Sequence, residues 1–338
     1  MPTPPHPTRS LRTFLTGLVD YAGLFPPAKL DMQKAVETYA RCARGEHEWM
    51  LGRFICPAAR LAEFEKTAGG GGMLPGTLAT SGYREYAEHS GGGEPWRLSV
   101  LVDASSSAAL DADLDAIAAF NERHTDEDHG MAVIDAVELK VDSPTTIDRV
   151  LDEMPEYLSP FFEIPTIVEK GEDCRGFVAA LSGSKASAKI RTGGVTPEAY
   201  PSAFSIAAFL RACHAADVPF KATAGLHHPI RSEHALTYEA GSVRGVMHGF
   251  VNVFLAAAFV RVLGTRLDDH SLVKLLSETK GAAFAFTDEG ATWTPSPSGA
   301  AVRISATDLA RVRESFALSF GSCSFDEPVE DVTGLGWM

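Results

Sequence analysis

Short hydrophobic segments alternate with longer segments of helical pattern along most of the chain. The short segments are predicted strands, which begin near residues 19, 53, 98, 136, 161, 188 and 220. The longer segments carry apolar residues at helical spacing, as in residues 108–123, where Leu110, Leu114, Ile117 and Phe120 share one face. Repeated strand–helix pairs indicate a parallel sheet that is covered by helices.

The number of strands decides between a closed barrel and an open sheet. Residues 249–254 would supply an eighth strand, although this apolar segment suits a helix equally well. A count of eight favours a (β/α)8 barrel over an open doubly wound sheet. No Gly-x-Gly-x-x-Gly motif follows the early strands, which weakens the case for a dinucleotide-binding fold.

Three regions are expected along the chain. Residues 1–10 are a proline-rich tail that we predict to be disordered, and residues 11–264 form the barrel. Residues 265–338 form a C-terminal α/β extension packed on the barrel, with a hairpin turning at 288–290 and a terminal turn at 320–325. This extension covers one barrel end, makes an oligomer contact or supplies the eighth strand.

Composition narrows the classes of partner. The chain has 338 residues, of which 45% are hydrophobic and 22% charged, as in an ordinary globular protein. A net charge of −14 argues against a nucleic-acid partner and against binding to an anionic membrane surface. The N-terminus lacks signal-peptide character, no apolar run is long enough to cross a bilayer, and the five cysteines form no Cys-x-x-Cys pair. We therefore expect a cytoplasmic protein with reduced thiols.

The stretch 188–228 reads as strand, helix, strand, with one lysine on each strand. Lys189 and Lys221 lie 221 − 189 = 32 positions apart, which is about one βαβ unit of roughly 30 residues. They should therefore stand at matching heights on neighbouring strands. Desolvation and a second cation both lower the pKa of a lysine, and a neutral amine can form a Schiff base with a carbonyl.

The same stretch resembles a known family. Lys-Ile-Arg-Thr-Gly-Gly, then Thr-Pro-Glu-Ala, then Phe-Lys-Ala-Thr-Ala-Gly-Leu is similar to the last third of deoxyribose-phosphate aldolase and other class I aldolases of that barrel type. The resemblance implies an aldolase-type barrel in which Lys189 forms the Schiff base and Lys221 is its partner. The chain departs from the family at Arg191, where the family has a small hydroxyl residue, and at His227 and His228, where the family has part of a phosphate-binding turn.

Further candidate residues stand at the carboxyl ends of the predicted strands, where barrel enzymes place their sites. Glu138 matches the family's proton-relaying aspartate in strand order and in pointing into the barrel. Lys140 lies two residues further on the same strand, so its side chain points the same way and makes it a third candidate amine. Arg191 could bind a substrate carboxylate through its planar fork. The remaining candidates for substrate binding are Thr223, His227, Asp20 and Asp103.

The expected function is that of a class I lyase that makes or breaks a carbon–carbon bond in a small carbonyl or keto-acid substrate. No cofactor and no metal is implied, and the small substrate is the expected partner, with a homo-oligomer compatible with the sequence. One alternative is a metal-dependent barrel lyase or isomerase that uses His227 with Asp103, Glu138 or Glu163. Another is a non-catalytic binding protein, since fold does not determine function.

Overall fold

Eight parallel strands close into a barrel. The computed structural model describes residues 6–76, 94–125, 129–167, 170–295 and 299–338. The order around the barrel is β1-β13-β7-β6-β5-β4-β3-β2, and β2 pairs with β1 to close it. The strands are β1 (Val19–Tyr21), β2 (Leu51–Pro57), β3 (Trp96–Leu101), β4 (Ala132–Lys140), β5 (Ser159–Glu163), β6 (Ser187–Arg191), β7 (Phe220–Thr223) and β13 (Ala317–Ser322). The predicted (β/α)8 barrel is confirmed, and the seven predicted strands are all present.

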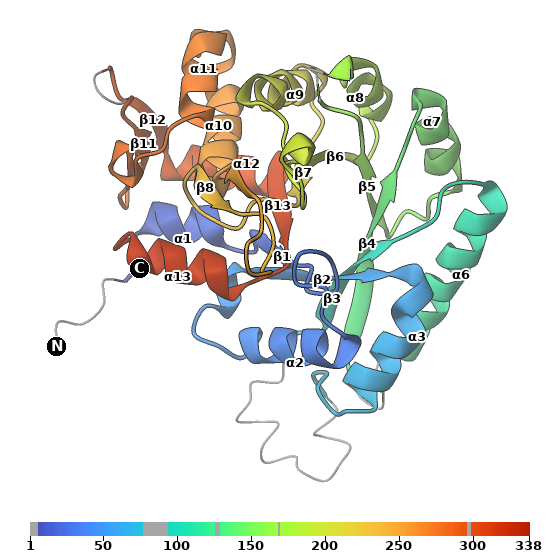
Figure 1. Cartoon of the computed structure of the whole chain (residues 1–338). Coiled ribbons are helices and arrows are strands. Elements are labelled where there is room, and N and C mark those ends of the chain that lie inside the picture. Colours follow the sequence, from blue (N-terminus) through green and yellow to red (C-terminus); the bar gives the residue numbers. More distant parts are fainter. Residues whose placement is uncertain (1–5, 77–93, 126–128, 168–169, 296–298) are drawn as a thin grey trace, which may run out of the picture.

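Helices surround the barrel on the outside (Figure 1). They are α1 (Arg9–Leu15), α2 (Met32–Cys42), α3 (Leu61–Phe64), α6 (Ser107–Arg123), α7 (Pro144–Glu153), α8 (Arg175–Leu181), α9 (Ala203–Ala216), α10 (Phe250–Leu263), α11 (Asp269–Leu276), α12 (Ala306–Ser315) and α13 (Asp326–Gly334). The helix α1 starts at Arg9, so the expected disordered tail 1–10 was too long. Residues 1–5 of that tail lie outside the described residues.

Many of these helices begin where a side chain can accept a hydrogen bond from the first turn. A free N–H group at a helix start needs an acceptor, which serine and aspartate supply from the N-cap position. The residues that cap in this way are Asp31, Ser106, Ser143, Ser202, Asp268 and Ser305. At the other end, α9 stops at Asp217, whose left-handed backbone (φ 55°) turns the chain towards β7.

The eighth barrel strand comes from near the end of the chain. β13 lies between β1 and β7, pairing Phe320 with Val19 on one side and with Ala222 on the other. The barrel therefore does not end at residue 264, because a part of the expected extension 265–338 completes it. The expected terminal turn at 320–325 was also wrong, since Phe320 lies inside β13 and α13 follows.

The apolar segment that competed for the eighth strand is the helix α10. It is buried on all sides from Phe250 to Val260, which explains why its sequence shows no polar face. On its barrel side, Phe250 and Phe254 pack on Phe320 with ring centroids 5.2 and 5.9 Å apart. Asn252 is also buried, and its side-chain amide donates to the carbonyl oxygens of Leu275 and Glu278.

Two small antiparallel sheets are inserted between β7 and β13. A hairpin of β8 (Ser232–Ala235) and β9 (Arg244–Met247) follows β7 directly. A three-stranded sheet of β10 (Phe284–Phe286), β11 (Gly290–Trp293) and β12 (Val302–Ser305) comes later, and its first hairpin confirms the predicted turn at 288–290. Hydrogen bonds from the backbone N–H groups of Arg9 and Ser10 join this sheet to α1.

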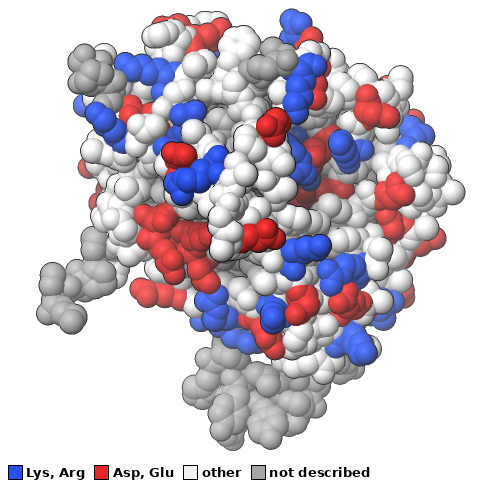
Figure 2. Space-filling model, in the orientation of Figure 1, with Lys and Arg blue, Asp and Glu red and all other residues white. Residues whose placement is uncertain are grey.

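Acidic side chains gather over α13, where Asp326, Glu327, Glu330 and Asp331 follow closely in sequence (Figure 2). In the described part of the chain, no helix has both the length and the apolar character needed to cross a membrane. The five cysteines are free and buried.

The packing of β13 against α10 can be tested with one large-to-small substitution. Phe320 is fully buried, so F320A should lower the free energy of unfolding by about 3–5 kcal/mol, through lost burial and the cavity left behind. The measurement is chemical denaturation followed by circular dichroism. F204A is the matched control, because Phe204 is 57% exposed on α9 and its loss should change stability by less than about 0.5 kcal/mol. Equal effects of the two substitutions would contradict the described packing.

Candidate active site

The two lysines stand side by side inside the barrel. Strands β6 and β7 pair Lys189 directly with Lys221, as the spacing predicted. Glu138 of β4 bridges them, because its Oε2 lies 2.8 Å from Lys189 Nζ and its Oε1 lies 2.6 Å from Lys221 Nζ. Each amine has a second carboxylate: Glu163 Oε2 is 2.9 Å from Lys189, and Asp20 Oδ2 is 2.7 Å from Lys221.

The remaining lone pairs of these carboxylates are also used. Ser99 Oγ donates to Glu138 at 2.8 Å, and Ser319 Oγ donates to Asp20 at 2.7 Å. The other oxygen of Asp20 accepts the backbone N–H of Arg53 at 2.7 Å. Buried charges are tolerated when they are both paired and hydrogen-bonded, and this cluster meets both conditions.

The pKa of Lys189 is raised, whereas the sequence led us to expect that a second lysine would lower it. Burial lowers the pKa of Lys189, but Glu138 and Glu163 more than offset burial and raise it above the ordinary value. Burial likewise raises the pKa of Glu138, and the two lysines reverse this and hold it well below its usual range. The pKa of Glu163 is lowered in the same way, by Lys189 and Arg191. In the resting site, Lys189 is therefore an ammonium group between two carboxylates.

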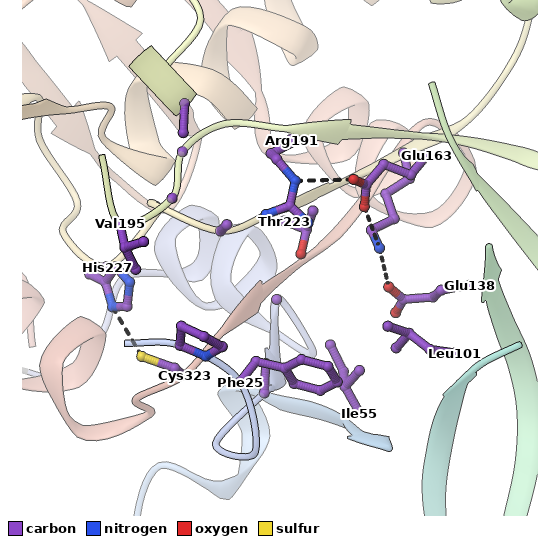
Figure 3. Close-up of a pocket in the computed structure, with 18 of the residues that line it drawn as sticks. Phe25, Ile55, Leu101, Glu138, Glu163, Arg191, Val195, Thr223, His227 and Cys323 are labelled. Carbon is purple, nitrogen blue, oxygen red and sulfur yellow. Dashed lines mark hydrogen bonds and ion pairs between the residues drawn. The ribbon is translucent and has the colours of Figure 1, made fainter. Parts of the chain in front are cut away.

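A pocket opens above this cluster at the carboxyl ends of the strands. It has a volume of about 360 Å³ and reaches Lys189, Glu138 and Glu163 at its floor. Lys221 lies beneath and is fully buried. Apolar side chains form much of the wall, and Figure 3 shows Phe25, Ile55 and Leu101 on one side of the pocket. Lys189 is thus placed to meet a ligand, while Lys221 is placed to support it from below.

Arg191 and Thr223 stand at the rim of the same pocket. Arg191 is the last residue of β6 and its Nε donates to Glu163 Oε1 at 3.0 Å, while half of its side chain remains exposed. The loops behind these strands meet closely: a Cβ at Gly193 would lie 2.8 Å from the Cα of Gly225, so neither position has room for a larger residue. Gly225 also has a positive φ of 74°, which favours glycine.

His227 lines the pocket at the side away from Glu138 and Glu163, next to Cys323 (Figure 3). It follows β7, and its Nδ1 lies 3.0 Å from Glu327 Oε2 of α13 and 4.0 Å from Cys323 Sγ. The neighbouring His228 turns to Asp331, with Nδ1 at 2.6 Å from Oδ2, and stacks on His234. Of the two adjacent histidines, His227 is part of the pocket wall and His228 is not.

Some of the predicted site residues lie elsewhere. Lys140 is the last residue of β4 and is exposed, because the strand ends there and the side chain leaves the barrel. Asp103 is exposed after β3, and its carboxylate accepts the backbone N–H of Ser105. Asp20 is buried below the pocket as the partner of Lys221 rather than beside a ligand. The pocket walls include none of these three residues.

Other residues of the site were not among the predicted set. Glu163, which the sequence suggested only for the metal-dependent alternative, ends β5 and contacts both Lys189 and Arg191. Cys323 and Glu327 reach His227 from 96 and 100 positions away, so no local pattern could have revealed them. Within the described ranges, no group of three or more His, Cys, Asp or Glu side chains could hold a metal ion.

Comparison of the chain with protein-family models, with curated proteins and with solved structures finds no match.

The buried ion pairs predict a strong and pH-dependent effect of removing one amine. K221M leaves Asp20 and Glu138 without that partner, so it should lower the free energy of unfolding by about 3–5 kcal/mol at pH 7. Lys221 is one of the two lysines that lower the pKa of Glu138, and a lowered carboxyl pKa stabilises the fold above the ordinary value, a contribution that is lost as pH falls towards the lowered pKa. The difference between wild type and K221M should therefore shrink in acid, as urea denaturation at several pH values would show.

The matched control for this substitution is K140M, at the end of β4. Lys140 is exposed, so its replacement should change stability by less than about 0.5 kcal/mol at any pH. A K221M protein as stable as K140M would contradict the buried ion pairs.

Proposed function

We propose that the chain is a class I lyase in which Lys189 forms a Schiff base with a small carbonyl substrate, in a barrel of the aldolase type. The observation that carries the proposal is that Lys189 reaches the pocket floor while its partner Lys221 is sealed beneath it. An apolar pocket with a few convergent polar groups is the usual form of a small-molecule site. The resemblance over residues 188–228 supports the same assignment of the two lysines.

Imine formation in this site needs a proton transfer first. The ammonium group of Lys189 must lose a proton before its nitrogen can attack a carbonyl carbon. Glu138 and Glu163 both lie within hydrogen-bonding distance of that nitrogen, at 2.8 and 2.9 Å, and either carboxylate can receive the proton. Glu138 contacts both amines, so it is the residue that can redistribute charge between Lys189 and Lys221 while the imine forms and breaks.

A keto acid suits the rim of the pocket. Arg191 uses Nε for Glu163 and is half exposed, so its terminal nitrogens can reach a carboxylate on the substrate. Thr223 lies on the neighbouring strand in register with Arg191 and also lines the pocket. A carbonyl carbon near Lys189 and a carboxylate near Arg191 would place the reacting bond in the apolar part of the pocket.

The Schiff base is tested by borohydride trapping with pyruvate, 2-oxobutyrate, acetaldehyde and dihydroxyacetone. Wild type should form a reduced adduct on Lys189, located by intact mass and peptide mapping, and Lys189→Met should form none. Because the pKa of Lys189 is raised, trapping should accelerate as pH rises above neutrality. Lys140→Met is the matched control and should be trapped like wild type. An adduct on another lysine, or none with the whole panel, would refute the proposal, and the latter result would favour a non-catalytic binding protein.

The role of Arg191 predicts a selective loss of affinity for keto acids. Removing a charge-assisted contact of about 1.5–3 kcal/mol should raise the pyruvate concentration for half-maximal trapping by about 10–100-fold in R191Q. Trapping of acetaldehyde, which has no carboxylate, should be unchanged. If both substrates are weakened equally, Arg191 acts on Lys189 through Glu163 and does not bind a substrate carboxylate.

A further inference from the structure

A second polar cluster meets the pocket opposite the lysine end. His227 forms part of the pocket wall and is 6% exposed, with Glu327 on its Nδ1 at 3.0 Å. Cys323 completes this wall, and Tyr238, from the loop between β8 and β9, places its hydroxyl 3.6 Å from the Cys323 sulfur. The cluster is assembled from three separate parts of the chain, namely the loop after β7, the β8–β9 hairpin and the segment from the end of β13 into α13.

The contact with Glu327 fixes which ring nitrogen serves the pocket. A carboxylate on Nδ1 holds the proton there and orients the ring, which leaves Nε2 as the reactive nitrogen. Among the described residues, Nε2 of His227 has no hydrogen-bonding partner. A ligand in the pocket would therefore meet the Nε2 edge of a ring that is held from behind. Cys323 approaches the same Nδ1 at 4.0 Å, so it does not share the Nε2 side and is not placed as a nucleophile activated by this histidine.

The surroundings of His227 favour its protonated form. Burial lowers the pKa of His227, but the Cys323 sulfur and the Glu327 carboxylate more than offset burial and raise it to about 9. The other titratable groups nearby are Tyr238, whose hydroxyl contacts Glu327, and His228 beside it in the chain. Acidic residues gather over α13 (Figure 2), the helix that brings Glu327 to His227, and they add to the negative potential there.

We propose that His227 is the acid that protonates the carbonyl oxygen of an acceptor aldehyde while a donor bound to Lys189 attacks it. This inference rests on the proposed Schiff-base function and adds the second half of its chemistry. The two groups act from opposite sides of one pocket, with the imine end at Glu138 and Glu163 and the acid end at His227 and Cys323 (Figure 3). The second substrate is accordingly an aldehyde small enough to fit between them.

The step balances without any further reactant. The nucleophilic carbon of the enamine on Lys189 bonds to the aldehyde carbon, and the enamine nitrogen becomes an iminium nitrogen. The π electrons of the aldehyde move to its oxygen, which takes the proton from Nε2 of His227. His227 is left neutral, with the proton on Nδ1 still donated in a hydrogen bond to Glu327, and Nε2 regains a proton from solvent after the product leaves. In cleavage the same atoms move in reverse, and neutral His227 takes the hydroxyl proton.

Glu327 is a positioning residue in this scheme. Its carboxylate orients the ring and stabilises the imidazolium, but it does not line the pocket. E327Q keeps an acceptor for Nδ1 and removes the charge. The pKa of His227 should fall in this variant, so His227 should lose its acidic proton at a lower pH than in wild type.

The experiment separates the two halves of the reaction in the full-length protein, with pyruvate as donor and propanal as acceptor. Deuterium exchange at the pyruvate methyl group, followed by NMR, reports imine and enamine formation, and the aldol product reports coupling. H227Q should exchange deuterium like wild type and couple about 10²–10⁴-fold more slowly, the usual contribution of an acid–base group. The ratio of coupling to exchange should fall as pH rises through about 9 in wild type, and at lower pH in E327Q.

The adjacent histidine provides the matched control. His228 also pairs with a carboxylate of α13 but does not line the pocket, so H228Q should couple and exchange like wild type. Normal exchange in H227Q together with an unchanged ratio of coupling to exchange would overturn the role of His227 and leave the Schiff-base function standing. A ¹⁵N NMR titration that gives His227 a pKa below 7 would do the same. Absence of both exchange and trapping in wild type would instead refute the Schiff-base function on which it rests.

Discussion

Every charged side chain inside the barrel must have a partner of opposite charge, because an unpaired charge in a protein interior is very costly. Glu138 is the centre of this arrangement, since it contacts both Lys189 and Lys221. With Asp20, Glu163 and Arg191 included, three acidic and three basic side chains interact and their formal charges cancel. The positions of β1, β4, β5, β6 and β7 are thereby linked, because each contributes at least one member.

The same pairing of charges determines the protonation state of Lys189 before any reaction. A lysine that faces only other cations and apolar walls becomes neutral and reactive, whereas Lys189 is raised in pKa by two carboxylates. Stability and reactivity therefore oppose each other at this residue. A substrate carboxylate that draws Arg191 away from Glu163 would relieve this conflict, because Glu163 would then be free to take the proton of Lys189. Substrate binding and amine activation would in this way be coupled through one acidic side chain.

Local patterns were sufficient for most of the fold and for the floor of the site. Seven strands, the capped helix between β6 and β7, and the adjacent lysines follow from hydrophobic periodicity and from a 32-residue spacing. The eighth strand could not be found in this way, because Ala-Leu-Ser-Phe-Gly-Ser is mixed in polarity, whereas the apolar segment of α10 was the stronger candidate for a strand. The alternation of side chains along β4 correctly placed Glu138 inside the barrel but failed at Lys140, because alternation does not show where a strand ends.

The features of the site that the sequence did not predict depend on contacts between distant parts of the chain. His227 was chosen as a candidate from its place after β7, but its partners arrive with β13 and α13, after an insertion of two small sheets and three helices. Because β13 must pass between β1 and β7 to close the barrel, its end delivers Cys323 and then Glu327 to the rim beside His227. The strand that completes the fold also completes the second end of the pocket. A barrel closed by any other segment would keep the paired lysines and lose the carboxylate that holds His227.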